Sequence, residues 1–346
     1  MIRKLLEVIG KMDDKIIQLF TISNDVLSIS VTDFGATMFN LLANDRDGNK
    51  ADVILGYKHL ESYYDNGEFI GCVVAPNANR IGKGLVRIGD NEYHLAINNG
   101  LNNLHTDFEN GAAKKLMKST IVNDGVVFST SFVDGEHGLP GNRDFSVSFE
   151  LKENELHIAY NFISDKDTIF NPTNHNYFNM AGHNGGSILD QYMMIDADYI
   201  TPVDEYLIPT GLLQSVDGTP FDFRKPKKIG QQINDDDQQL KYGNGYDHNF
   251  VLNNYDGSLK EVASLYDEAS GRKMTCLTTQ PGIQIYTANY LNRADGKEGA
   301  QYGKNDGVCF ETQFFPDAVN HDNFETTIVK ANERITYKTV YRFTVE

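Results

Sequence analysis

Alternation of apolar and polar residues with a period of two runs through most of this chain. It is clearest in six segments rich in Val, Ile, Phe, Tyr and Thr, at residues 16–22, 26–32, 126–132, 145–151, 155–163 and 337–345. This period places successive side chains on opposite faces of a strand, and these residue types suit pleated, half-buried surfaces. The pattern therefore predicts an all-β fold in which one face of each sheet lies against a core.

Short turn signals, such as Asp47-Gly48 and Asp256-Gly257, separate the predicted strands. Helical periodicity is scarce, and we expect only short helices, at Leu60–Asn66 and around Gln231–Leu240. Connections this short favour antiparallel neighbours. The sequence therefore indicates a large antiparallel β-sandwich.

The domain organisation follows from what the sequence lacks between these segments. No Pro/Ser-rich linker, no repeat and no shift in composition divides the 346 residues. All-β sandwiches often exceed 200 residues as one unit, so this length fits a single domain. We expect one domain over residues 13–346, with residues 1–12 as an N-terminal extension.

The formal net charge of −17 at pH 7 restricts the partners of the chain. A surface of this sign repels the phosphates of nucleic acids and anionic lipid headgroups. A neutral small molecule is indifferent to the field. We therefore expect no nucleic-acid partner and no membrane partner. Separately, we expect the chain to be a monomer or a homodimer.

The three cysteines, Cys72, Cys276 and Cys309, are odd in number and far apart, without the spacing of a zinc site. Scattered single cysteines are typical of a reducing compartment. The N-terminal apolar run is broken by Glu7 and Lys11 and lacks a cleavage site, so it does not resemble a signal peptide. No stretch of about 18 apolar residues occurs that could span a membrane. We expect a cytoplasmic protein.

Ionisable and amide side chains concentrate in five stretches of the β pattern. They are VVAPNANRIGKG (73–84) with Asn79 and Arg80, NNGLNNLHT (98–106) with His105, NPTNHNYFNMAG (171–182) with His175 and Tyr177, GYDHNFVL (245–252) with Asp247, and GVCFETQFFPDAVNH (307–321) with Glu311. Amide side chains bond hydroxyl groups, and aromatic rings stack on the C–H faces of sugars. Such loops are typical of carbohydrate recognition.

Glu311 is the sharpest candidate, because its neighbours Val308, Cys309, Phe310 and Phe314 are apolar. A carboxylate in such a segment is costly to bury unless it is paired or functional. The alternative is that alternation turns Glu311 to the solvent face of an edge strand. Taken singly, the other candidates also have structural alternatives: a turn held by Asn side chains at His175, and an Asx turn at Asp247.

Metal and nucleotide chemistry lack their sequence signatures. The nine histidines include no HExxH pair and no two-His–one-carboxylate spacing. The chain also has no GxGxxG after a strand, no GxxxxGK[ST] and no GxSxG. We therefore expect no metal and no cofactor.

Taken together, the five stretches resemble the aldose 1-epimerases, the galactose mutarotase family. NPTNHNYFN (171–179), GTPFDFR (218–224) and ETQFFPDAVNH (311–321) are specific in combination, and TTQPGIQIYTANYL (278–291) fits as well. The resemblance runs from about residue 15 to the C-terminus. It implies a large antiparallel β-supersandwich and an isomerase that interconverts the anomers of free hexoses such as galactose and glucose.

The resemblance also implies roles for individual residues. His175 corresponds to the general acid of the family and Glu311 to its general base. The residues that hold the sugar correspond to Asn79, Arg80, His105, Tyr177, Asp247 and Gln284. One departure is the segment His105-Thr106-Asp107, where family members commonly have two glycines after the histidine and a tryptophan further on. This change puts the shape of the loop, and the preference among sugars, in question.

Mutarotation needs an acid and a base together, because the bond from C1 to O5 breaks while the anomeric hydroxyl loses its proton. A glutamate accepts that proton and a histidine donates one to O5, without metal or cofactor. Two alternatives stay open at this point. A hexose-6-phosphate mutarotase would need a basic pocket, for which Lys83 and Arg87 accompany Arg80. A non-catalytic sugar-binding protein of the same fold would not need the acid–base pair.

Overall fold

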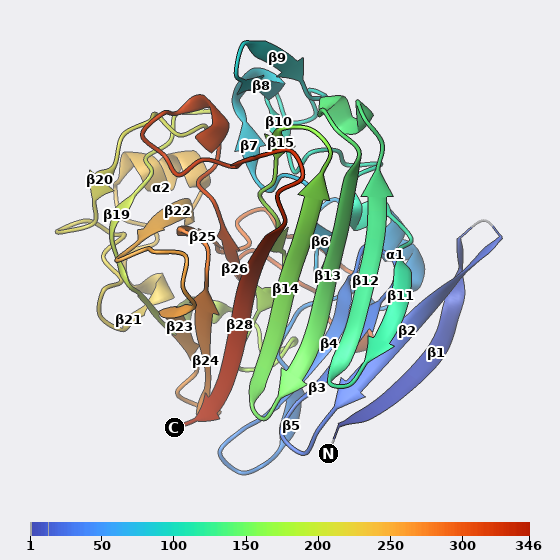
Figure 1. The fold of residues 1–346 in the computed structure, drawn as a ribbon. Helices are drawn as coiled ribbons and strands as arrows, with labels where there is room; N and C mark the ends of the chain where they lie inside the picture. Colours follow the sequence, from blue (N-terminus) through green and yellow to red (C-terminus); the bar gives the residue numbers. More distant parts are fainter. Residues whose placement is uncertain (1, 13) are drawn as a thin grey trace.

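The computed structural model describes residues 2–12 and 14–346. Its largest sheet has nine antiparallel strands, which follow one another across the sheet as β11 (Lys118–Val122), β12 (Gly125–Phe132), β13 (Arg143–Lys152), β14 (Glu155–Ser164), β28 (Ile335–Val345), β24 (Arg272–Thr278), β23 (Lys260–Tyr266), β18 (Tyr192–Ile195) and β21 (Lys227–Lys228). Figure 1 shows the long central strands of this sheet side by side. The six alternating segments of the sequence all form strands: four of them lie in this sheet, as β12, β13, β14 and β28, and the other two lie in a five-stranded sheet.

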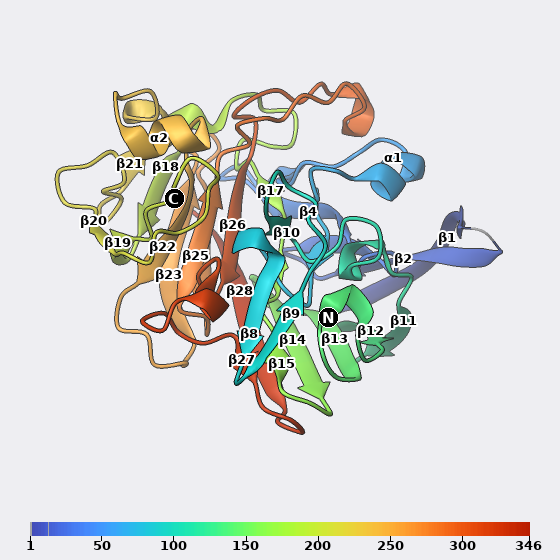
Figure 2. The ribbon, with the colours of Figure 1, turned by 90° about the horizontal axis from the view of Figure 1, so that it is seen from above.

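Two further sheets complete the main layers. One has five strands in chain order: β1 (Arg3–Met12), β2 (Lys15–Ser23), β3 (Ser28–Thr32), β4 (Met38–Asn44) and β5 (Lys50–Asp52). The other has six strands, in the order β17 (Tyr177–Phe178), β26 (Val308–Gln313), β25 (Gly282–Tyr286), β22 (Asp247–Leu252), β19 (Ala197–Ile200) and β20 (Gln214–Ser215). Figure 2 shows this last sheet from above, with β26 beside β17.

Short strand pairs and single helical turns connect these layers. The pairs are β6 (Val73–Val74) with β16 (Thr173–Asn174), β7 (Arg80–Ile81) with β10 (Asn103–Leu104), β8 (Leu85–Ile88) with β9 (Asn91–His94), and β15 (Thr168–Ile169) with β27 (Ile328–Val329). The 3₁₀ turns are Gly82–Gly84, Ala112–Lys114, Glu136–Gly138, Ile188–Asp190, Ile229–Gln231, Lys297–Gly299 and Ala318–Asn320.

The main core lies between the nine-stranded sheet and the two smaller sheets. Phe20 of β2 meets Phe128 of β12 with ring centroids 5.4 Å apart, and Phe178 of β17 meets Tyr341 of β28 at 4.9 Å. One cluster of buried apolar side chains joins strands of all three sheets. This arrangement confirms the predicted all-β, antiparallel sandwich, because each sheet buries the apolar set of its alternating pattern.

The two expected short helices are present. α1 spans Leu60–Asp65 and α2 spans Gln238–Gly243. The side chain of Asp237 caps α2 by accepting the backbone N–H groups of Gln239 and Leu240, at 2.8 and 3.2 Å. Among the described residues, no helix is long and apolar enough to cross a membrane.

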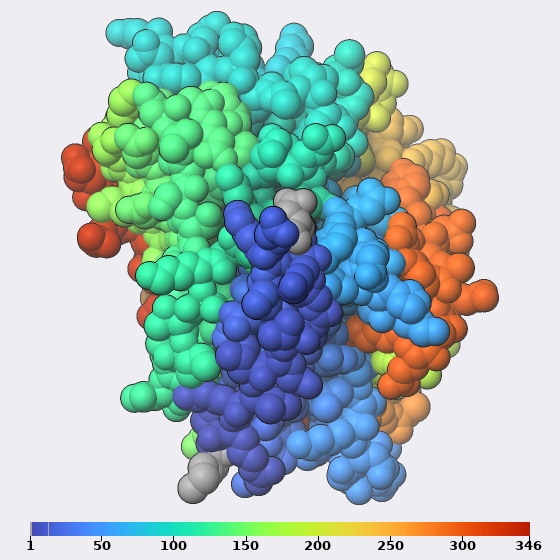
Figure 3. All heavy atoms as spheres, turned by 90° about the vertical axis from the view of Figure 1, so that its right-hand side faces the viewer, coloured from blue at the N-terminus to red at the C-terminus, as the bar shows by residue number. Residues whose placement is uncertain are grey.

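Residues 3–12, expected as an extension, form strand β1, which pairs with β2 at the edge of the five-stranded sheet. Their side chains are mostly exposed, and the hydroxyl of Tyr64 donates to the carbonyl oxygen of Lys11 at 3.1 Å. Figure 3 shows these residues in dark blue on the surface, beside the light blue segment that contains α1. The segment is therefore hydrogen-bonded to the sheet along its length. Residues 1 and 13 of the expected boundary lie outside the described residues.

Candidate active site

The register of the six-stranded sheet brings distant polar residues onto one face. Glu311 of β26 lies opposite Gln284 of β25, and Tyr286 of β25 lies opposite Asp247 of β22. On the other side of β26, Cys309 lies opposite Tyr177 of β17. Because alternate residues of a strand share a face, Cys309 and Glu311 point to the same side as these partners. The core side of β26 is instead occupied by Phe310, which belongs to the main apolar cluster.

This face forms the floor of a cavity of about 210 Å³. That volume lies below the ~300–1,000 Å³ of pockets for drug-sized ligands, so the cavity suits a monosaccharide. Its walls are formed by Gly67, Glu68, Phe69, Asn79, Arg80, Leu104, His105, His175, Tyr177, Asp247, Tyr286, Tyr290 and Glu311. A larger hollow, of about 550 Å³, lies over β12, β13 and β14, and the described residues that line it include no histidine and no pair of carboxylates.

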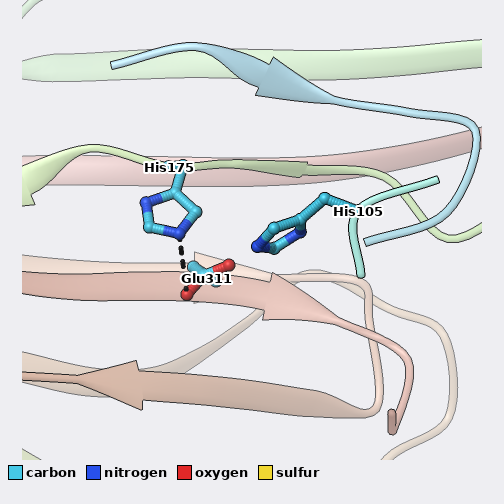
Figure 4. A group of neighbouring side chains, drawn as sticks. All are labelled: His105, His175 and Glu311. Carbon is cyan, nitrogen blue, oxygen red and sulfur yellow. Dashed lines mark ion pairs between the residues drawn. The ribbon is translucent and has the colours of Figure 1, made fainter. Parts of the chain in front are cut away.

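His175 is held over the cavity by backbone hydrogen bonds to the segment before β6. Its N–H donates to the carbonyl oxygen of Cys72 at 2.9 Å, and its carbonyl accepts from Gly71 at 3.0 Å. The rigid backbone aims the ring at Glu311, and Figure 4 shows the two side chains facing each other. The atoms Nε2 of His175 and Oε1 of Glu311 are 3.7 Å apart.

His105 and Asn79, both in the cavity wall, are joined by two hydrogen bonds. The N–H of His105 donates to the carbonyl oxygen of Asn79 at 3.0 Å, and the N–H of Asn79 donates to Nδ1 of His105 at 3.1 Å. Both residues have positive φ, 53° for His105 and 59° for Asn79. Asn and His tolerate this left-handed region better than most residues. The two hydrogen bonds therefore stabilise an otherwise unfavourable backbone and fix the ring of His105.

Thr106 accounts for the departure from the family pattern after His105. Its φ is 67°, in the region where glycine is favoured and a β-branched residue is strained. The buried hydroxyl accepts the N–H of Asn77 at 2.9 Å and donates to the carbonyl oxygen of Asn77 at 2.8 Å. These two hydrogen bonds offset the strain. The loop therefore keeps the glycine-like conformation without the glycine.

Arg80, Asp247 and Gln284 form a chain of polar contacts along the wall. Nη1 of Arg80 lies 3.9 Å from Oδ2 of Asp247, and Nε2 of Gln284 donates to Oδ1 of Asp247 at 2.6 Å. The side chain of Asn99 accepts from Nε of Arg80 at 3.2 Å. Asp247 is thus held from two sides, and Gln284 reaches the site through Asp247 rather than as part of the cavity wall.

Asp317, which was not among the predicted site residues, clamps the segment that carries Arg80. Its N–H donates to the carbonyl oxygen of Arg80 at 2.9 Å, and its Oδ1 accepts the N–H of Gly82 at 3.0 Å. Asp317 belongs to the same ETQFFPDAVNH segment as Glu311. Its carboxylate is buried, and this burial raises its pKa. One segment of sequence therefore supplies both Glu311 and the support of Arg80.

Replacing Asp317 by Ala is expected to raise KM by about three- to tenfold and to change kcat less, because the Arg80 segment loses one anchor while Glu311 and His175 keep theirs. Steady-state kinetics with a sugar that the resemblance implies measures both constants. Asp317→Asn is the matched control, since its amide oxygen can still accept from Gly82 and Asn tolerates the φ of 57° at this position. Equal effects of the Ala and Asn variants on KM would contradict the role of the Asp317 side chain in holding the segment that carries Arg80.

Burial dominates the electrostatics of the His175–Glu311 pair. Glu311 is 2% exposed and His175 is 5% exposed, and the ring of Phe69 lies with its centroid 4.6 Å from that of His105 and 6.2 Å from that of His175. Loss of solvent raises the pKa of Glu311 well above its ordinary value, with the charge of Asp247 acting in the same direction and Arg80 opposing. Burial lowers the pKa of His175 to about 4, although its own backbone favours the charged ring.

In the empty site, burial therefore shifts both groups toward their neutral forms, a protonated Glu311 and a singly protonated ring of His175. Oε2 of Glu311 has no hydrogen-bond partner among the described residues. A buried carboxylate oxygen without a partner is costly, and this cost is removed when a ligand hydroxyl donates to it. The site is thus arranged to accept a proton donor at Glu311.

The atoms of His105, His175 and Glu311 lie within 4.8 Å of one another, close enough to hold a metal ion. Nδ1 of His105 accepts a backbone N–H, which can only donate, so the neutral ring carries its proton on Nε2. Burial and the neighbouring His175 and Arg80 keep the pKa of His105 well below its ordinary value. Neither nitrogen of His105 then offers a free lone pair, and this group does not fit a metal ion.

The structure brings the predicted site residues together. Seven of them line the cavity, and Gln284 contacts one of the seven. The solvent-face alternative for Glu311 is wrong, because β26 lies between β17 and β25 and all its residues are buried. Sequence reasoning missed Phe69, Tyr286 and Tyr290. Alternation from Gln284 would have placed Tyr286 on the same face, whereas no local signal marks Phe69.

The family model described as Aldose 1-epimerase matches residues 18–342. The chain belongs to the aldose 1-epimerase family. Galactose mutarotase of Bos taurus is 40% identical over 332 residues, covering 95% of this chain and 94% of the relative. Aldose 1-epimerase of Escherichia coli is 32% identical over 334 residues, covering 95% and 96%.

Solved structures of the family agree with the fold described above. Galactose 1-epimerase of Lactobacillus acidophilus is 29% identical, has a TM-score of 0.87, and the similarity covers 100% of this chain and 99% of that chain. A GalM/aldose epimerase homologue of C. elegans is 26% identical, with a TM-score of 0.85 and coverage of 93% and 97%. As a member of this family, the chain is an isomerase with the supersandwich fold that the resemblance implied.

Proposed function

We propose that this enzyme interconverts the α and β anomers of a free hexose such as galactose or glucose, with Glu311 as the general base and His175 as the general acid. The observation that carries this proposal is the pair itself. The two side chains face each other at 3.7 Å on the floor of a monosaccharide-sized cavity, and Oε2 of Glu311 has no partner among the described residues. The family of the chain supports the same activity.

The reaction needs only proton movements at two atoms of the sugar. In the sugar complex the step starts from the ion pair, with Glu311 ionised and both nitrogens of His175 protonated. Glu311 takes the proton of the anomeric hydroxyl as the bond from C1 to O5 breaks, and His175 gives a proton to O5. The products are the open aldehyde, a protonated Glu311 and a neutral His175. Rotation about the bond from C1 to C2 presents the other face of the aldehyde. Ring closure then returns both protons, so the enzyme ends in its starting state.

The partner of Nδ1 decides which of the two neighbouring histidines acts as the acid. Nδ1 of His105 meets a backbone N–H, so protonation of this nitrogen would set two donors against each other. His105 therefore stays neutral and serves as a fixed donor to a sugar oxygen. Nδ1 of His175 meets the sulfur of Cys309 and, among the described residues, no backbone N–H, so this ring can carry the second proton that an acid needs.

Positioning of the sugar falls to the remaining polar residues of the site. Asp247 accepts hydroxyl protons, and its orientation is set by Arg80 and Gln284. Arg80 and Asn79 donate to hydroxyl or ring oxygens. Tyr177 forms part of the wall, with its hydroxyl engaged by the carbonyl oxygen of Glu68 at 2.8 Å. This division of roles is the part of the proposal that substitutions test best.

The charge of the cavity favours a neutral sugar over a sugar phosphate. Glu68, Asp247 and Glu311 line it, and Arg80 is the one Lys or Arg among the described residues of the wall. Lys83 is exposed, and Arg87 is exposed and pairs with Glu92 at 2.9 Å. A phosphate at the wall would therefore meet carboxylates rather than the basic cluster that it requires. A sugar-binding protein without catalysis would have no use for the buried acid–base pair.

Polarimetry on freshly dissolved α-galactose tests the proposal. The enzyme is expected to speed the change in rotation, with glucose as a second substrate and glucose 6-phosphate as a much poorer one. Binding of galactose in calorimetry without faster rotation would support the sugar-binding alternative instead. Preference for glucose 6-phosphate would support the phosphate alternative.

We also propose a cytoplasmic location, supported by three cysteines that are all free and buried. A monomeric or homodimeric state stays a prediction, which sedimentation or light scattering of the purified chain checks.

A further inference from the structure

The ring of His175 has a second neighbour on the side away from Glu311. Its Nδ1 lies 3.5 Å from Sγ of Cys309, within the range of a hydrogen bond to sulfur. Cys309 is 0% exposed and comes two residues before Glu311 on β26. The same strand face therefore carries the base and the group that contacts the far nitrogen of the acid.

The thiol of Cys309 stays protonated, because burial raises its pKa well above the ordinary value and the charges of Glu311 and Asp247 act in the same direction. A thiol is a weak acceptor as well as a weak donor. The thiol can therefore accept a hydrogen bond from Nδ1–H of His175. The backbone N–H that faces Nδ1 of His105 can only donate, so it cannot accept one. The rings of His105 and His175, with centroids 5.4 Å apart, therefore differ in the partner of Nδ1: a backbone N–H at His105 and a thiol at His175.

We propose that Cys309 is a positioning residue for His175: its sulfur accepts Nδ1–H, so that Nε2 is the nitrogen that gives and takes the catalytic proton. This inference rests on the proposed role of His175 as the acid. The charged ring holds protons on both nitrogens. When Nε2 gives its proton to O5, the neutral ring keeps Nδ1–H on the sulfur, and Nε2 presents a lone pair that can take the proton back. The thiol itself neither loses nor gains a proton.

The experiment compares Cys309→Ala, Cys309→Ser and Cys276→Ala. Cys276 is the matched control, since it is equally buried but lies on β24 in the main core. Cys309→Ala is expected to lower kcat by about five- to tenfold with KM changed by less than about twofold, because the lost contact orients the acid but does not touch the sugar. Cys309→Ser keeps a group that accepts Nδ1–H and is expected to recover most of kcat. Cys276→Ala is expected to keep the wild-type kcat.

Nitrogen NMR of the histidine rings gives a readout that is independent of turnover. In the wild type, the neutral ring of His175 is expected to show a protonated Nδ1 and an unprotonated Nε2, and in Cys309→Ala a mixture of both tautomers. Unchanged tautomers together with wild-type kcat in Cys309→Ala would overturn the inference. So would an equal loss of kcat in Cys276→Ala, since that loss would be a packing effect. If the wild-type enzyme itself did not speed anomerisation, the proposed function would fail instead.

Discussion

Glu311→Gln is expected to lower kcat by ~10²–10⁴-fold, the usual range for loss of a positioned general base. The amide has nearly the shape of the carboxylate, so the sugar still fits and KM should change little. It has no lone pair basic enough to take the proton of the anomeric hydroxyl. Polarimetry with purified variant and wild type measures the effect. A variant with near-wild-type rates would remove Glu311 from the role of base.

The same substitution is expected to stabilise the protein at neutral pH by about 1–2 kcal/mol, because the native state no longer holds a buried carboxyl group that resists ionisation. The sign of this stability change follows from the pKa of Glu311, which is higher in the folded state than its ordinary value of 4.5. Below pH 4.5 the group is neutral in both states and costs nothing. As the pH rises above 4.5, the unfolded chain ionises first, and wild-type stability falls relative to the variant.

Denaturant unfolding at pH 4 and pH 7.5 measures this difference. The gap between variant and wild type should be larger at pH 7.5. Glu205→Gln, a substitution at an exposed position, serves as the control and should change neither stability nor kcat. A variant that is less stable than the wild type at pH 7.5 would contradict the strain assigned to Glu311.

His175→Asn is expected to lower kcat by a similar ~10²–10⁴-fold, because O5 then leaves C1 without a proton donor. The acid limb of kcat/KM gives a second signature. The wild-type pair takes up a second proton as the pH falls through about 4, the pKa of His175 in the folded state. We expect an acid limb near that pH in the wild type and its loss in the variant.

His105→Asn provides the comparison for the second histidine. Its Oδ1 can accept the N–H of Asn79, and Asn tolerates the φ of 53°. We expect a fall in kcat/KM of about tenfold at most, carried mainly by KM, with the acid limb retained, because a fixed donor is lost rather than the acid. If His105→Asn removed the acid limb and His175→Asn kept it, the two roles would be reversed.

Stability should respond to acid through His175 as well. Its folded-state pKa of about 4 lies below the ordinary 6.5. The stability that depends on a neutral His175 ring is therefore fully present only above pH 6.5. As the pH falls from 6.5 towards 4, the unfolded chain takes up the proton first and the protein loses stability. The Asn variant should lose less stability over this window, which thermal unfolding at several pH values would reveal.

The β architecture followed from the sequence because a period of two is a local property. The segments 126–132, 145–151 and 155–163 became β12, β13 and β14 with ends that differ by no more than two residues. Residues 1–12 were harder to assign, since the exposed side chains of β1 carry little burial pattern. Pairing with β2 is a backbone property, and backbone hydrogen bonds leave no signal in side-chain polarity.

The residue types of the site were also readable from the sequence. A glutamate among phenylalanines and a histidine among asparagines stand out locally, and the family resemblance gave their order. Their protonation did not follow from the sequence. Burial raises the pKa of Glu311 and lowers that of His175, and the charges of Asp247 and Arg80, which come from distant segments, also act on the pKa of Glu311.

What the sequence by itself determined is a large antiparallel β protein, because alternation is a property of short segments. Its motifs also indicated the family and, through the resemblance, which two residues to propose as an acid–base pair. Only the tertiary structure decided that Glu311 is buried, that Asp317 supports Arg80, and that His105 is locked as a neutral donor. These properties depend on desolvation and on hydrogen-bond partners that the register of β17, β26, β25 and β22 and the packing of the loops bring together. No local pattern contains that information.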